Sequence, residues 1–76
     1  MNNVIIYGPA GCGKTRNKYA LARYYGKGRV VDEFRGTINP GTRDSLLIGE
    51  MREVFGLERS DRLIPFDAAM KEAGLS

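Results

Sequence analysis

The feature that most constrains the fold of this chain is a short apolar run followed at once by a glycine-rich segment. Residues 4–7 read Val-Ile-Ile-Tyr, and residues 8–15 read Gly-Pro-Ala-Gly-Cys-Gly-Lys-Thr. An apolar run without polar alternation is typical of a strand that is buried on both faces of a sheet. The stretch that follows contains no Gly or Pro until Gly26, which is typical of a helix. The sequence therefore predicts a central strand, a glycine loop and a crossover helix in direct succession.

The glycine loop has the spacing that a phosphate-binding loop requires. It matches the pattern G-x-x-x-x-G-K-[ST], in which the glycines let the backbone curl with its N–H groups pointing inward. Lys14 adds an ammonium, Thr15 adds a hydroxyl, and the start of the following helix favours an anion. The alternative is a turn that only joins a strand to a helix, or a loop that has lost its ligand. The residues expected to bind the ligand are Gly8, Pro9, Ala10, Gly11, Cys12, Gly13, Lys14, Thr15 and Arg16.

Residues 4–15 resemble the Walker A segment of P-loop NTPases. A longer stretch, covering about half of the chain, is similar to small phage and prophage ATPase-like proteins without an established function. This wider likeness is carried by Lys14-Thr15-Arg16-Asn17, Ala20-Leu21, Tyr24-Tyr25-Gly26 and Arg29–Phe34. The resemblance implies a minimal P-loop fold that binds ATP or GTP with Mg²⁺, in which Lys14 is a catalytic residue.

A Mg²⁺ ion that arrives with a triphosphate needs an oxygen ligand in addition to Thr15. Asp32 is the first candidate, because it directly follows the apolar pair at 30–31. In a Walker B strand, an acid likewise follows an apolar run. The apolar run before this acid is shorter than the one that P-loop NTPases usually have. In those proteins the Walker B run also usually lies on a later strand. The alternative is a solvated strand end in which Asp32 pairs with Arg29 or Arg35.

Other charged residues are candidates for the chemistry of phosphoryl transfer. Glu33 is a candidate catalytic general base that orients an attacking water. Glu50 competes with Asp32 for the metal. Arg35 and Arg43 lie in a loop expected to hang over the phosphates, where an arginine could stabilise developing charge in cis or across a homodimer. The alternative for both arginines is ordinary solvent exposure.

The rest of the chain predicts a small α/β domain. The further elements expected are strands at Arg29–Phe34, Ser45–Ile48 and Arg62–Phe66, one or two helical turns at Met51–Phe55, and a helix at Ala68–Ala73 capped by Asp67. Pro65 makes the last strand an edge strand, because proline donates no ladder hydrogen bond. We therefore expect one domain over residues 1–76, in which a three- or four-stranded, mostly parallel sheet carries two or three helices. Ligands would bind at the carboxyl ends of its strands.

Charge and aromatic residues are unevenly distributed. The first 31 residues carry six Lys or Arg side chains and no acid, although the whole chain has a net charge of only +3. A basic half suits a phosphate-bearing ligand, but the same residues could form the solvated face of the first helix. The aromatic side chains expected to pack in the core, with base stacking as the alternative for the tyrosines, are Tyr19, Tyr24, Tyr25, Phe34, Phe55 and Phe66.

Length and composition indicate a cytoplasmic protein. A chain of 76 residues has a small hydrophobic core, so we expect it to gain stability from a homodimer or a larger protein assembly. It has no apolar run long enough to cross a membrane and no layout of a secretory signal, so we expect no membrane partner. Its single cysteine, Cys12, suits a reducing compartment.

The sequence as a whole favours a nucleotide-binding protein with weak or partner-dependent hydrolysis of ATP or GTP. The alternative is a small basic module that binds nucleic acid or a protein assembly and uses the glycine loop only as structure. Of these partners, nucleic acid is not favoured, because the chain shows neither alternating aromatic and basic residues nor zinc-ligand spacing. A kinase for a small metabolite comes third, because it would need a lid and an acceptor pocket.

Overall fold

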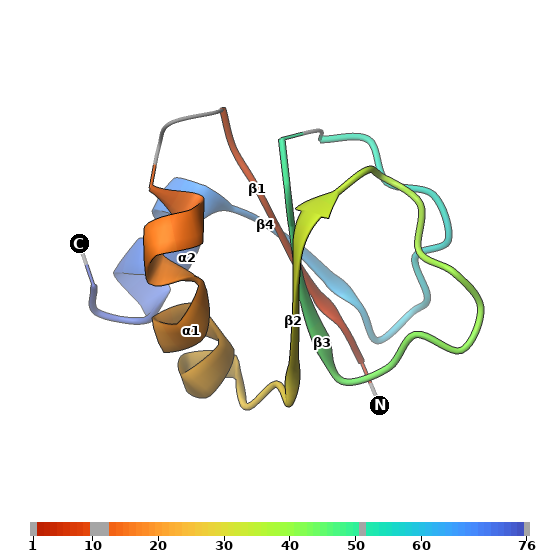
Figure 1. The fold of residues 1–76 in the computed structure, drawn as a ribbon, viewed down its shortest axis with the longest axis horizontal. Helices are drawn as coiled ribbons and strands as arrows, with labels where there is room; N and C mark the ends of the chain where they lie inside the picture. Colours follow the sequence, from red (N-terminus) through yellow and green to blue (C-terminus); the bar gives the residue numbers. More distant parts are fainter. Residues whose placement is uncertain (1, 10–12, 51, 76) are drawn as a thin grey trace.

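The chain forms a four-stranded, all-parallel sheet. The computed structural model describes residues 2–9, 13–50 and 52–75. The strands are β1 (Val4–Tyr7), β2 (Arg29–Phe34), β3 (Ser45–Gly49) and β4 (Arg62–Pro65), in the spatial order β2-β3-β1-β4 (Figure 1). The expected α/β class is confirmed, with β1 inside the sheet and the proline-containing strand β4 at an edge.

Two helices pack on the same face of this sheet, as Figure 1 shows. Helix α1 (Lys14–Tyr25) follows the glycine loop, and helix α2 (Phe66–Glu72) follows β4 directly. Leu21 of α1 and Ala69 of α2 are both 0% exposed. The other buried residues of this core are Val4, Ile6, Ala22, Leu46, Ile48, Ile64 and Phe66.

Loops rather than helices cover the opposite face of the sheet. Ile38 packs there against Ile5 and Leu47, and Val54 adds to this smaller core. Two loops also pair with each other: the N–H of Ile38 donates to the carbonyl of Phe55 at 2.8 Å, and the N–H of Phe55 donates to the carbonyl of Gly36 at 2.7 Å. This pairing joins segments that are far apart in the sequence.

The predicted helical turns at Met51–Phe55 are absent from the described part of that segment. Residues 52–55 contain no helix, and Met51 lies outside the described residues. The backbone of Phe55 is bonded across to Gly36 and Ile38, so it is not available for helical bonds. The ring of Phe55 is 66% exposed, so its assignment to the core was also wrong.

The beginning of α2 also differs from the expectation. The helix begins at Phe66, its N-cap residue is Pro65 in an extended conformation, and Asp67 lies within the first turn rather than at the cap. Phe66 is buried in the core on the helix side of the sheet. Because this residue packs against the sheet, the helix already begins there, one residue before Asp67.

Only one of the three tyrosines of α1 packs against the core. Tyr25 does so, whereas Tyr19 is 69% exposed and Tyr24 is 50% exposed. Successive helical residues are rotated by about 100°, so the neighbour of a core-facing Tyr25 points away from the sheet. The predicted packing of Tyr19 and Tyr24 was therefore wrong.

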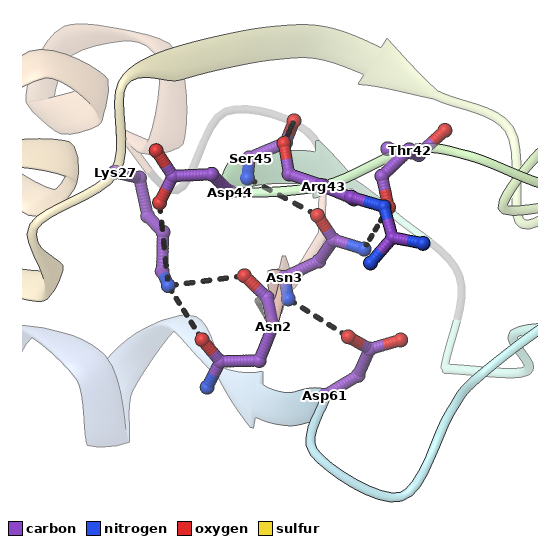
Figure 2. A network of polar contacts seen from close by, with 8 residues as sticks. All are labelled: Asn2, Asn3, Lys27, Thr42, Arg43, Asp44, Ser45 and Asp61. Carbon is purple, nitrogen blue, oxygen red and sulfur yellow. Dashed lines mark hydrogen bonds and ion pairs between the residues drawn. The ribbon is translucent and has the colours of Figure 1, made fainter.

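A polar network joins the loops at the amino ends of the strands (Figure 2). Asn3 is 2% exposed, and its backbone N–H donates a hydrogen bond to Asp61 at 2.8 Å. Its side chain donates a hydrogen bond to the carbonyl of Thr42 and accepts one from the N–H of Ser45. The Lys27 ammonium donates to the backbone carbonyl and side-chain oxygen of Asn2 at 3.0 and 2.9 Å. These bonds hold the edge of the sheet opposite the glycine loop.

Candidate functional site

The glycine loop begins at the carboxyl end of β1, beside the carboxyl end of β3. The N–H of Gly8 donates to the carbonyl of Gly49 at 3.2 Å, which holds the first residue of the loop against the neighbouring strand. The chain leaves β1 towards β2 and leaves β3 towards β4, so the two connections run in opposite directions. Such a switch point is where open parallel sheets bind their ligands.

Lys14 ties the start of α1 to the start of the loop. Its Nζ donates to the carbonyl oxygens of Gly8 at 2.7 Å and Pro9 at 2.8 Å, and the residue is 8% exposed. The ammonium is thereby held over the first residues of the loop. Ala10, Gly11 and Cys12, which were also predicted to bind the ligand, lie outside the described residues.

Helix α1 begins in a way that suits an anion. Its N-cap is Gly13, which adopts a left-handed φ of 101° and has no side chain with which to cap the first N–H groups. The first turn carries no acid. The N–H groups at the start of a helix and the positive end of its dipole favour a phosphate at this point. Thr15 and Arg16 follow in this turn and are exposed.

Asp32 of β2 faces this first turn. Its Oδ2 accepts a hydrogen bond from the Lys18 ammonium at 3.3 Å, and its Oδ1 accepts one from the N–H of Glu33 at 2.9 Å. Partial burial works to raise the pKa of Asp32, but the hydrogen bonds from Glu33 and Lys18 and the nearby Thr15 hydroxyl outweigh it and hold that pKa below its ordinary value. The structure therefore brings together Thr15 and Asp32, the two predicted metal ligands.

A bulge in β2 positions this carboxylate. Val31 pairs with Leu47 and Phe34 pairs with Gly49, so two residues of β2, at 32 and 33, lie opposite one residue of β3. Glu33 adopts a left-handed φ of 59° within the bulge. Bulges of this kind reorient side chains next to functional sites. The strands approach closely here, because a Cβ on Gly49 would lie 2.5 Å from the carbonyl oxygen of Phe34.

The remaining predicted site residues are more scattered. Glu33 and Glu50 are exposed near the carboxyl ends of their strands, and Arg35 is exposed just after β2. Arg43 precedes β3 and lies in the network at the amino ends (Figure 2). Its predicted place above the phosphates was wrong, because a parallel sheet puts the residue before a strand at the edge opposite the glycine loop.

Lys18 is the site residue that sequence reasoning did not single out, since the basic residues of this helix were left open between a half that suits a phosphate and a solvated face. The available signal was its spacing: it lies four residues after Lys14 and three after Thr15, positions that share one side of a helix. The alternative interpretation paired Asp32 with Arg29 or Arg35, but Lys18 is the residue that forms the ion pair with it.

The donor set fits a magnesium ion that arrives with phosphates. Mg²⁺ usually takes one or two carboxylates together with phosphate oxygens and waters, and Asp32 and Thr15 supply one carboxylate and one hydroxyl. Among the described residues, no three or more His, Cys, Asp or Glu side chains are grouped so that they could hold a metal. The pair therefore suits a metal shared with a ligand rather than one enclosed by protein alone.

Models of known protein families, curated proteins and solved structures gave no match to this chain. Within residues 2–9, 13–50 and 52–75, neither helix has the length and apolar character needed to cross a lipid bilayer.

Proposed function

We propose that this protein binds the phosphates of ATP or GTP together with Mg²⁺, and that any hydrolysis is weak or depends on a partner. The observation that carries the proposal is the convergence of Lys14, the first turn of α1 with its glycine N-cap, and the Thr15–Asp32 pair at the carboxyl edge of the sheet. A cation, backbone N–H groups and two oxygen ligands are the parts that a metal-bound polyphosphate requires.

Each residue has a distinct role in this proposal. The Lys14 ammonium, held near Gly8 and Pro9, attracts the negative phosphates, and the first N–H groups of α1 donate to their oxygens. Thr15 and Asp32 hold the metal from two different elements. When bound, Mg²⁺ neutralises charge on the phosphates.

Weak hydrolysis follows from the residues that surround the site. Glu33 is the candidate general base, but it is exposed. Arg35 is exposed as well, so we expect stabilisation of the transferring phosphate to need a second copy of the chain or another protein. A cytoplasmic location and an assembly of this kind belong to the same proposal.

The test is calorimetric titration of ATP and GTP, with Mg²⁺ or with EDTA, into the wild-type protein, Lys14→Ala and Asp32→Asn. Lys14→Ala should lose affinity under both conditions by roughly 10- to 100-fold, the range of a charge-assisted hydrogen bond. Asp32→Asn should lose only the part of the affinity that depends on Mg²⁺, because its amide is a poorer metal ligand.

Circular dichroism of each variant controls for folding, since Lys14 also ties the loop together. Asp32→Asn still tests the site if Lys14→Ala unfolds. Equal titration curves for all three proteins would contradict the proposal. Binding of single-stranded DNA without nucleotide binding, with an affinity that falls steeply with salt, would favour the nucleic-acid alternative instead.

A further inference from the structure

Lys18 forms an ion pair with one of the two candidate metal ligands. Its Nζ lies 3.3 Å from Asp32 Oδ2, and the two side chains are only 22% and 29% exposed. Thr15 lies one turn earlier on α1 and approaches the same carboxylate. The Asp32 carboxylate thus lies near the Thr15 hydroxyl from the first turn of α1 and the Lys18 ammonium from its second turn.

An ammonium and a divalent cation exclude each other at this position. Magnesium requires its oxygen ligands at about 2.0–2.1 Å in a nearly octahedral arrangement. An ammonium that is hydrogen-bonded to the same carboxylate would repel the magnesium ion. It would also take up space that the magnesium ion and its other ligands require. The Lys18 side chain is long and partly exposed, so it has room to swing away.

We infer that Lys18 occupies the cation position of the Thr15–Asp32 pair, so that a divalent cation enters only by displacing it. Lys18 thereby sets the Mg²⁺ concentration at which the site fills. This inference rests on the proposed function for its metal ligands, and it adds a residue that determines which cation the site holds. A site of this design holds its own counter-ion until a divalent cation displaces it.

The test compares Lys18→Met with the wild-type protein by titration with MgCl₂ alone, at constant ionic strength. The amide NMR signals of Thr15 and Asp32 report filling of the site without any measurement of activity. Lys18→Met should fill at about two- to fivefold lower Mg²⁺ concentration, which is the effect expected on removing a partly exposed ion pair. Lys18→Arg keeps the charge and should behave like the wild-type protein.

Arg23→Met is the matched control, because it removes one positive charge from the exposed side of the same helix. It should leave the Mg²⁺ titration nearly unchanged. Equal shifts in Lys18→Met and Arg23→Met would overturn the inference, since both would then reflect net charge alone. A Lys18→Met protein that fills at the same or a higher Mg²⁺ concentration than the wild-type protein would also overturn it.

A parallel titration with ATP separates this inference from the proposed function. If the Lys18→Met shift appears with Mg²⁺ alone but no protein binds ATP, the cation role of Lys18 stands and the proposed function fails. If ATP binds with the same Mg²⁺ dependence in every variant, the proposed function stands and the role of Lys18 fails.

Discussion

Asp32 is surrounded by hydrogen-bond donors from two elements. The N–H of Glu33 reaches it because the bulge turns that residue to a left-handed φ, and Lys18 and Thr15 reach it from α1. Each donor stabilises the ionised carboxylate relative to its protonated form. Asp32 therefore stays negatively charged well below neutral pH, which the proposed role as a metal ligand requires.

Replacing Lys18 by Met should raise the pKa of Asp32 towards the ordinary value of about 3.9, because one charged donor is lost. In the wild-type protein the pKa of Asp32 is lower in the folded than in the unfolded state. Asp32 therefore stabilises the fold above about pH 3.9, and this contribution is lost as the pH falls through the lower pKa of the folded protein. A ¹³C NMR titration of the Asp32 carboxyl measures the change. An unchanged pKa would contradict it, and Arg23→Met should leave the pKa as it is.

At the level of elements, α1 positions more of the candidate site than any other segment. It supplies Lys14, Thr15 and Lys18 on one side and is anchored to the sheet through Leu21 and Ala22. The helix contains no acid and exposes two of its tyrosines, so its attachment depends on a small number of buried residues.

Leu21→Ala should lower the free energy of unfolding by about 2–5 kcal/mol, because it removes a fully buried side chain and leaves a cavity. Tyr19→Ala, two residues earlier on the exposed side, should change the free energy of unfolding by no more than about 0.5 kcal/mol. Urea denaturation followed by circular dichroism measures both. Similar losses in the two variants would show that α1 is not anchored as described.

At the scale of the whole molecule, the candidate site is shared by parts that are far apart in the sequence. The loop after β1, the first turns of α1 and the bulge of β2 all contribute, and β3 holds the loop through Gly49. A ligand that binds this arrangement stabilises only the folded chain, so the stability of the domain should report its binding.

We therefore expect MgATP or MgGTP at 100 times its dissociation constant to add about 2.7 kcal/mol of stability. For a domain of this size, that corresponds to a rise in Tm of roughly 10–20 °C. Thermal melts followed by circular dichroism measure the rise, and Asp32→Asn in the presence of Mg²⁺ should show a smaller one. The absence of any rise at saturating nucleotide would count against a ligand site in the folded protein.

Local patterns predicted the elements that have strong signals of their own. The apolar runs became β1 and β3, the stretch without Gly or Pro became α1, and Pro65 lies on an edge strand. The predicted pairing of Thr15 with Asp32 also follows from topology, because parallel strands end at one edge. The prediction of helical turns at Met51–Phe55 was wrong for its described part, because a short segment with a weak signal takes its conformation from the segment that it pairs with.

By itself, the sequence determined the positions of the strands and of α1 and the spacing of the glycine loop, because these depend on residues close together in the chain. Only the tertiary structure decided that both helices cover one face, that Arg43 lies at the far edge and that Lys18 reaches Asp32. The reason is physical: strand order, the bulge of β2 and the direction of a side chain result from packing between segments that no local pattern connects.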